Sequence, residues 1–137
     1  MKNKIMYKHF KFKKFMKKSG MLIPLELNKK FPIKIKRIFI IYGKKNYIRG
    51  DHAHKKCSQF FIPIFGKIKL SFINKKTKGV RILNHKKKEG FLLKPKNWCK
   101  LEFITQNTIL LVLCDMPYDF NDYIEDYQDF LKYIKKK

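Results

Sequence analysis

The sequence predicts an all-β protein, a sandwich or small barrel of short strands, that ends in one α-helix. Short apolar or alternating segments follow one another at a spacing of roughly 8–12 residues, which is typical of this fold class. The last segment instead repeats its apolar residues every three or four positions, as a helix does. With 137 residues, 45% of them hydrophobic, the chain is long enough to form one domain over residues 1–137.

The N-terminal part predicts strands that begin at the surface and become buried. Residues 1–18 predict short strands with alternating lysines, closed by a turn at 19–20. Residues 21–27 predict another short strand. In 33–42 an alternating pattern becomes fully apolar, so we expect this strand to begin exposed and to end buried.

The middle of the chain predicts the remaining strands. The stretch 47–54 is expected to be extended, and it leads into an apolar strand at 57–65. Residues 67–74 alternate, so every second side chain should face the core. Further short strands are expected at 80–83, 91–93, 101–104 and 108–114.

The C-terminal segment 121–137 predicts an amphipathic helix. Residues three or four apart form its apolar face: Tyr123, Ile124, Tyr127, Phe130, Leu131 and Ile134. Acidic residues at its start and lysines at its end match the helix dipole. We expect Asp119 or Asn121 to cap its N-terminus, and its apolar face to serve packing.

The formal net charge of +24 is typical of nucleic-acid-binding proteins. However, only three of the 34 basic residues are arginines, the side chain best suited to recognising phosphates and bases with two parallel hydrogen bonds. The lysines are spread along the whole chain. We therefore interpret the charge as a solvated lysine surface that can also attract an anionic ligand, and we expect no nucleic-acid partner.

The sequence also indicates a cytoplasmic protein. No apolar run reaches the ~18 residues of a membrane span, so no membrane partner is expected, and no signal-like segment follows the basic N-terminus. The three cysteines, Cys57, Cys99 and Cys114, lack a CxxC spacing. Such an odd set fits reduced thiols better than a disulfide framework.

The densest chemistry lies in the pair His52 and His54. In an extended strand, side chains two residues apart point to the same face, so both imidazoles should share one space, about 6–7 Å apart. Histidine is the side chain best able to take and give protons near neutral pH. The pair therefore predicts acid–base catalysis, without ranking either histidine as the base.

Two motifs resemble those of the cupins. The first comprises Gly50, His52, His54, Gln59 and Gly66, and the second runs from Gly90 through Pro95 to Trp98 and Cys99. The resemblance implies a double-stranded β-helix, or jelly roll, in which both motifs meet inside the barrel. Many cupins hold a metal through two histidines, a glutamate and a third histidine. Here the amide of Gln59 is a poor ligand, although a His/His/Cys set with Cys99 can hold zinc.

From about Ser19 to Ile134, longer segments of the sequence are similar to the corresponding segments of the sugar 3,4-ketoisomerases. These segments are RGDHAHKK with the following Gln59, IKRIFIIY, and DMPYDFNDYIEDYQDFLKYI. The similarity implies an isomerase without metal or other cofactor, which moves the keto group of dTDP-4-keto-6-deoxyglucose from C4 to C3 through an enediol. It implies that His52 and His54 are the catalytic bases. It also implies a homodimer that exchanges N-terminal strands within residues 1–20, and a product that is later aminated for surface glycans such as lipopolysaccharide.

Five further side chains are candidates for binding the nucleotide sugar: Arg37, Arg49, Gln59, Trp98 and Cys99. An arginine can clamp a diphosphate with two hydrogen bonds. The amide can bind the sugar or orient His54, and the indole can line the sugar or base pocket. Cys99 stands where several relatives have an active-site histidine, so the C4 configuration of the product, galacto or gluco, stays open.

Three alternative functions stay open from sequence. A dTDP-sugar 3,5-epimerase also uses a barrel and a histidine base, but the histidine pair and the C-terminal phrase match the ketoisomerases better. The second alternative is a non-catalytic cupin that binds a nucleotide sugar or a metal. The third is a lysine-rich nucleic-acid binder, which should show a steeply salt-dependent affinity for DNA.

Overall fold

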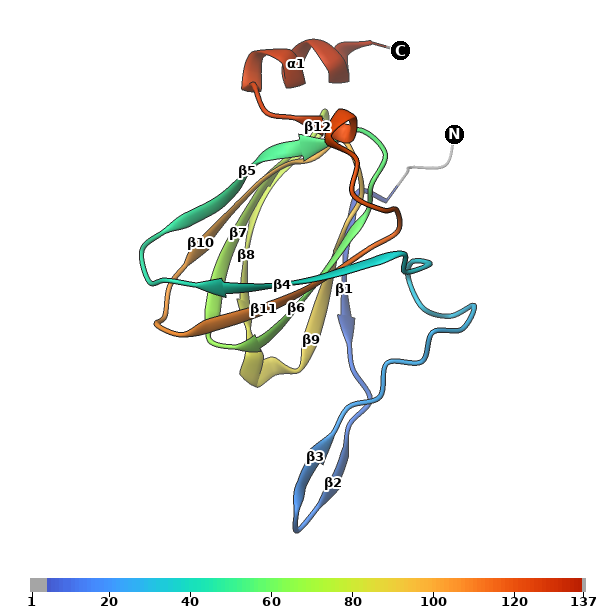
Figure 1. Ribbon diagram of the computed structural model, residues 1–137, viewed down its shortest axis with the longest axis vertical. Coiled ribbons are helices and arrows are strands. Elements are labelled where there is room, and N and C mark those ends of the chain that lie inside the picture. The colour runs from blue at the N-terminus through green and yellow to red at the C-terminus, as the bar shows by residue number, and fades with distance from the viewer. Residues whose placement is uncertain (1–4, 137) are drawn as a thin grey trace.

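The computed structural model describes residues 5–136 as two five-stranded antiparallel sheets with one α-helix (Figure 1). The first sheet contains, in spatial order, β1 (Tyr7–Lys11), β9 (Glu89–Leu93), β6 (Gln59–Phe65), β11 (Thr108–Cys114) and β4 (Arg37–Gly43). The second contains β12 (Tyr123–Ile124), β5 (Ile48–His54), β10 (Trp98–Phe103), β7 (Lys67–Ile73) and β8 (Lys78–Asn84). The helix is α1 (Tyr127–Lys135).

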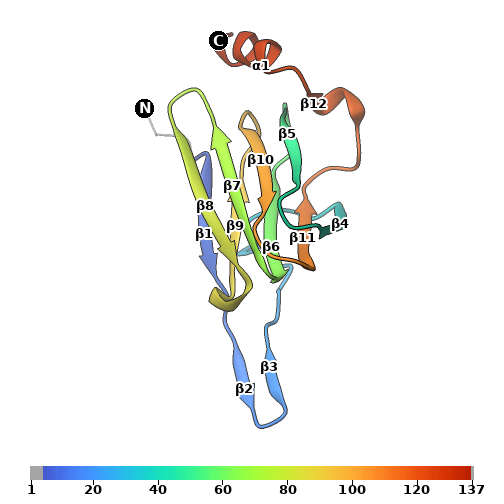
Figure 2. The ribbon, with the colours of Figure 1, turned by 90° about the vertical axis from the view of Figure 1, so that its left-hand side faces the viewer.

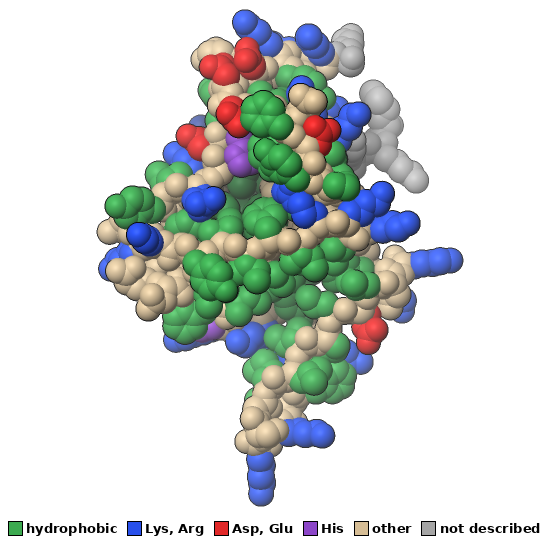
Figure 3. All heavy atoms as spheres, in the orientation of Figure 1, with side chains coloured by type: hydrophobic (Ala, Val, Ile, Leu, Met, Phe, Trp, Pro, Cys, Tyr) green, Lys and Arg blue, Asp and Glu red, His purple; other side chains and the backbone are tan. Residues whose placement is uncertain are grey.

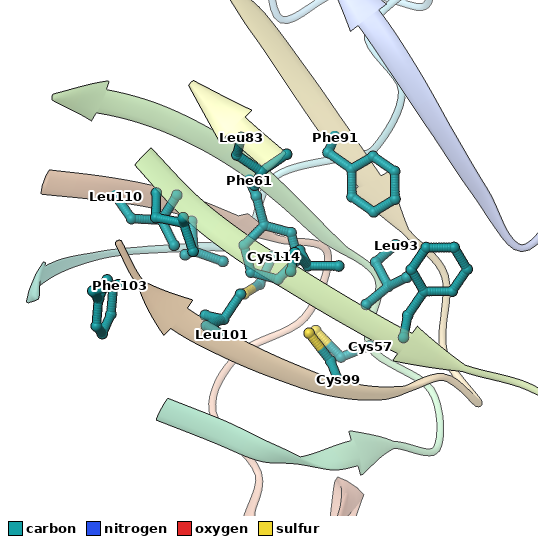
Figure 4. Close-up of a cluster of buried hydrophobic side chains, with 14 residues drawn as sticks. Cys57, Phe61, Leu83, Phe91, Leu93, Cys99, Leu101, Phe103, Leu110 and Cys114 are labelled. Atoms are coloured by element: carbon teal, nitrogen blue, oxygen red, sulfur yellow. The ribbon is translucent and has the colours of Figure 1, made fainter. Parts of the chain in front are cut away.

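The main core fills the space between the two sheets (Figure 4). Ile68, Leu70 and Phe72 of β7 are at most 1% exposed, as the alternation of this strand predicted. They belong to the same cluster as Phe61 and Val112 of the opposite sheet. The predicted fold class, an all-β cupin jelly roll with a C-terminal helix, is confirmed.

The strand β6 is buried from Gln59 to Pro63 because both faces of this part are covered, whereas Ile64 and Phe65 at its end are about half exposed. Phe61 belongs to the main core, whereas Phe60 belongs to a second cluster on the outer side of the first sheet. The rings of Phe10, Phe12 and Phe31 pack over Phe60, with centroids 5.6–6.2 Å away. The N-terminal segment therefore covers this outer face of the first sheet.

The N-terminal segment also forms a separate hairpin. After β1, the strands β2 (Phe15–Lys17) and β3 (Gly20–Leu22) pair only with each other and extend away from the sheets, at the end opposite α1 (Figure 2). The strand predicted at 21–27 thus ends early. The predicted N-terminal strands also include residues 1–4, which lie outside the described residues.

The C-terminal helix is shorter than the predicted span 121–137, whose last residue, Lys137, also lies outside the described part. Tyr123 and Ile124 form β12 instead, pairing with His54 and Ala53 of β5. Backbone pairing with a sheet edge satisfies the polar groups of this segment, so tertiary structure overrides the helical pattern there.

The predicted helix caps are wrong. The N-cap of α1 is Asp126, whose side chain accepts a hydrogen bond from the backbone N–H of Asp129. Asp119 instead caps the short 3₁₀ turn Phe120–Asp122. The apolar face of α1 does serve packing, because Phe130 is fully buried in a cluster with Ala53 and Trp98.

The strand predicted at 33–42 is observed as β4, from Arg37 to Gly43, while Ile33 is buried in the outer cluster.

No helix within residues 5–136 is long and apolar enough to cross a bilayer. Lys and Arg side chains are scattered over the face shown in Figure 3 and do not gather on one element.

Candidate active site

A cavity of about 460 Å³ opens between the two sheets, beside β4 and β5. It is lined by Phe39, Ile40, Ile41, Tyr42, Arg49, Gly50, His52, Gln59, Phe61, Cys99, Leu101 and Tyr123. Four of the seven site residues predicted from sequence therefore line it: Arg49, His52, Gln59 and Cys99. The other three, Arg37, His54 and Trp98, lie outside its wall.

The strand β5 carries both histidines toward the barrel interior. Their ring centroids lie 5.0 Å apart, closer together than the 6–7 Å expected from strand rise alone. The ring of Tyr123, from β12, packs on His52 at 4.9 Å and on His54 at 4.4 Å. The two imidazoles differ in depth, because His52 lines the cavity whereas His54 is buried and does not.

Asp122 holds His54 in place. Nδ1 of His54 lies 2.8 Å from Oδ2 of Asp122, and both side chains are buried. The other carboxylate oxygen of Asp122 accepts a hydrogen bond from the backbone N–H of Lys56 at 2.7 Å. The sequence analysis missed this role, because 68 residues separate His54 from Asp122. The one sequence signal was the acidic phrase DFNDYIED, which we interpreted as a helix start.

Burial lowers the pKa of both imidazoles below the ordinary value of 6.5. For His54, the hydrogen bond that its Nδ1 donates to Asp122 acts in the opposite direction and raises the pKa. Both rings are therefore neutral near pH 7. Because Asp122 accepts the proton of Nδ1, Nε2 of His54 carries the lone pair, and that atom has no hydrogen-bond partner among the described residues. A neutral imidazole with an unoccupied nitrogen can accept a proton.

A β-bulge in β5 brings Arg49 into the cavity. Cys99 pairs with His52 but Lys100 pairs with Gly50, so Asp51 has no partner on β10. Arg49 lies three residues from His52 and would face away from the cavity in a regular strand. The extra residue reverses the alternation, and Arg49 comes to lie opposite Leu101, whose side chain points into the core.

The bulge requires glycine at position 50. The φ angles of Gly50 and Asp51 are +80° and +59°, both in the left-handed region. A Cβ atom on Gly50 would lie 3.1 Å from the backbone oxygen of Cys99, tighter than an ordinary contact. Asp51 tolerates the left-handed conformation better than most side chains do, and its carboxylate has a partner outside the barrel.

That partner is Trp98, which corrects the prediction that Trp98 lines the pocket. Trp98 pairs with Ala53, whose side chain faces outward, so the indole lies on the outer face of the second sheet. Nε1 of Trp98 donates a hydrogen bond to Asp51 at 3.0 Å. The ring also packs against Phe130 of α1, with centroids 5.6 Å apart. Trp98 therefore holds the bulge from outside.

The two arginines have different places. Arg49 is exposed and lines the cavity, so its guanidinium is available to a ligand. Arg37 does not line the cavity; its Nη2 donates to the hydroxyl of Tyr123 at 3.4 Å, and its guanidinium lies over the rings of Phe39 and Tyr118. Arg37 therefore supports the cavity wall, and its direct contact with a ligand stays a prediction.

Gln59 and Cys99 are both buried parts of the cavity wall. Gln59 pairs with Cys114 of β11 in the first sheet, and no hydrogen bond joins its amide to His54 among the described residues. Burial raises the pKa of Cys99 to about 12, so its thiol stays protonated near neutral pH. Cys99 thus presents an uncharged wall and cannot act as a base there.

The cupin-type ligand set is not assembled. Within residues 5–136, one group of side chains has donor atoms close enough together for a metal ion, and it consists of His54, Cys57 and Asp122. This group includes neither His52 nor Cys99.

Comparison with known proteins identifies the family. The family model described as FdtA (WxcM-like, C-terminal) matches residues 5–135. The chain belongs to this family. This FdtA-family chain is 31% identical over 137 residues to a TDP-4-oxo-6-deoxy-alpha-D-glucose-3,4-oxoisomerase of Aneurinibacillus thermoaerophilus, covering 99% of this chain and 95% of that protein.

Two solved structures have the same fold as this FdtA-family chain over nearly its whole length. A 3,4-ketoisomerase from Helicobacter canadensis is 33% identical, with a TM-score of 0.88 over 95% of this chain and 98% of the other. A histidine-to-asparagine variant of the 3,4-ketoisomerase from Thermoanaerobacterium thermosaccharolyticum, in complex with TDP-4-keto-6-deoxyglucose, is 31% identical, with a TM-score of 0.88 over 96% of both chains. The predicted resemblance to the sugar 3,4-ketoisomerases is confirmed.

Replacing Asp122 with asparagine should lower the pKa of His54, because the variant loses the negative charge that favours the imidazolium. The neutral form of His54 then persists to lower pH than in the wild type. A pH titration of the histidine ring signals by NMR measures this shift. Asp119→Asn is the matched control, because Asp119 is exposed and asparagine can cap the turn Phe120–Asp122 as well as aspartate does. An unchanged or raised pKa of His54 in Asp122→Asn would contradict the assigned role.

Proposed function

We propose that this protein is a TDP-sugar 3,4-ketoisomerase, which converts TDP-4-keto-6-deoxyglucose to the 3-keto sugar. The observation that carries the proposal is the histidine pair: His52 lines the cavity, and His54 lies beside it and is held by buried Asp122. Family membership and relatives with this activity support the same conclusion.

The reaction requires proton transfers, and the site supplies neutral bases for them. The proton on C3, next to the C4 carbonyl, leaves first, and its electron pair forms the C3=C4 bond, while O4 takes up a proton to give an enediol. The O3 hydroxyl then loses its proton, and C4 takes up a proton, which leaves the carbonyl at C3. The substrate and product are isomers, so no net oxidant or reductant is consumed. We therefore propose that imidazoles carry the reaction without a cofactor.

The depth of the two histidines suggests how they divide this work. His52 touches the cavity, so we assign it the carbon-bound proton. His54 is buried, with its ring centroid 5.0 Å from that of His52, and we assign it the proton exchange behind the sugar. Asp122 stabilises the imidazolium that His54 becomes when it takes up a proton. Arg49, exposed at the cavity, is assigned to the diphosphate.

The alternatives differ in where hydrogen exchanges with solvent. A 3,5-epimerase exchanges hydrogen at C5 and leaves the ketone at C4, and a non-catalytic binding protein exchanges none. The family and the relatives support the ketoisomerase more than either alternative. The three free thiols also support the proposal of a cytoplasmic enzyme, because reducing compartments keep cysteines unpaired. The 3-keto product would be aminated by a later enzyme for surface glycans.

His52→Asn and His54→Asn should each abolish turnover of TDP-4-keto-6-deoxyglucose while the fold persists, because asparagine cannot exchange protons near pH 7. An NMR time course in D₂O with EDTA measures the product, the site of deuterium and, through its couplings, the C4 configuration. His85→Asn is the matched control, because His85 lies away from the cavity, beside Gly66 and Phe65. Near-wild-type turnover in both active-site variants would refute the proposal.

Trp98→Phe should weaken TDP binding by about tenfold, or about 1.4 kcal/mol. Phenylalanine keeps the ring packed against α1 but removes the N–H donor to Asp51, so the bulge that directs Arg49 loosens. Isothermal titration calorimetry with TDP measures the affinity. Tyr127→Phe, which alters a neighbouring ring without touching the bulge, is the control. Equal TDP affinity in Trp98→Phe and wild type would show that the hydrogen bond does not position Arg49.

We also propose that the protein is a homodimer that exchanges its N-terminal strands, and two features support this. The projecting β2–β3 hairpin exposes Phe15, Met16 and Leu22 at 50–65%. β4 is an edge strand of the first sheet, and its outer face exposes Ile38, Ile40 and Tyr42. Figure 3 shows hydrophobic side chains gathered on this side of the molecule. Such surfaces are typical of faces that another subunit covers.

The double variant Met16→Glu/Leu22→Glu should shift the protein from dimer to monomer, because charges on the hairpin oppose burial against a partner. Light scattering coupled to gel filtration gives the mass, expected at twice that of one chain for wild type. Val80→Glu, on an exposed position of β8, is the control and should stay dimeric. A monomeric wild-type protein, or a dimeric double variant, would refute exchange through the hairpin.

A further inference from the structure

Three buried side chains beside the cavity form a group that the isomerisation does not use as a whole. His54, Cys57 and Asp122 each offer a donor atom, and these atoms lie within 4.8 Å of one another. His54 and Asp122 are 5% exposed and Cys57 is 4% exposed. Only one ring nitrogen of His54 has a hydrogen-bond partner; the other, also buried, has none among the described residues. An imidazole, a thiol and a carboxylate are the ligands that Zn²⁺ prefers in proteins.

We propose that His54, Cys57 and Asp122 form a site for a thiophilic divalent cation such as Zn²⁺, and that the bound ion blocks the catalytic histidine. This site goes beyond the proposed function, which needs no metal. Because the bound ion occupies a histidine that exchanges protons, zinc inhibits the enzyme reversibly.

The charge balance favours a divalent ion. Coordination replaces the proton of the Cys57 thiol, which passes to solvent, and the carboxylate of Asp122 is the second negative charge. Nδ1 of His54, which faces Asp122, coordinates the ion once the ring proton moves to Nε2, which has no hydrogen-bond partner among the described residues. Two negative ligands thus neutralise the ion, although Arg37 nearby opposes it. That opposition favours modest, reversible binding over a permanent structural metal.

The geometry requires a small closure. Zinc bonds of about 2.0–2.3 Å in a tetrahedron bring donor atoms to roughly 3.3–3.8 Å from one another, so the three side chains must approach by roughly 1 Å. The cysteine is well placed for this, because Cys57 lies in the short loop between β5 and β6 and not within a strand. His54 would move least, because it is fixed on β5 and packed against Tyr123.

Cobalt titration of the EDTA-treated, reduced full-length protein tests the site, because a thiolate bound to Co²⁺ gives a charge-transfer band in the near ultraviolet. We expect the band in wild type at one equivalent, its displacement by Zn²⁺, and its loss in Cys57→Ser. Cys99→Ser is the matched control and should keep the band, because Cys99 is equally buried but lies outside the group. No band in wild type, or an unchanged band in Cys57→Ser, would overturn the proposal.

A second measurement does not depend on the variants folding. NMR of the histidine rings in wild type should show that Zn²⁺ shifts the signals of His54 more than those of His9 and His85. Shifts confined to His9 or His85 would indicate adventitious surface binding and overturn the site. Zinc should also suppress turnover, and EDTA should restore it. Because the cobalt band and the ring signals need no substrate, failure of the metal site is distinguishable from failure of the proposed isomerase function.

Discussion

The unpaired residue Asp51 in β5 shifts the alternation of side chains on the strand that carries the histidines. Before the shift, Arg49 shares its face with Leu101; after it, His52 and His54 share theirs with Cys99 and the core. The strand β5 therefore presents the guanidinium of Arg49, which can bind an anionic ligand, and the two histidine bases to the same cavity. The bulge requires two successive residues in the left-handed backbone conformation, which strains the chain. Glycine at position 50 keeps this strain low.

The same strand is secured from both of its faces. On the outer face, Trp98 bonds to Asp51 and packs against Phe130, so α1 supports the bulge indirectly. On the inner face, Asp122 bonds to His54, and the backbone of its segment pairs with β5. The C-terminal segment is therefore not an appendage. It orients the buried histidine, and its Tyr123 closes the cavity wall.

Burial gives the site its acid–base character. A pair of exposed imidazoles would be partly protonated at neutral pH, whereas burial lowers the pKa of His52 and of His54 and keeps both ready to accept protons. Asp122 limits this effect at His54 and fixes which nitrogen carries the proton. The buried thiol of Cys99, uncharged at the same pH, leaves the proton transfers to the imidazoles.

The sequence by itself determined the features that depend on local periodicity and chemistry. Alternation placed Ile68, Leu70 and Phe72 in the core, and the two-residue spacing placed both histidines on one face. The motif phrases identified the family. Only the tertiary structure decided the rest, because those features depend on contacts between distant segments. The bulge reversed the face of Arg49, pairing with β5 turned the start of the predicted helix into β12, and folding brought Asp122 to His54 across 68 residues. A pattern within one strand carries no information about such partners, since their positions are set by how the sheets and the C-terminal segment pack.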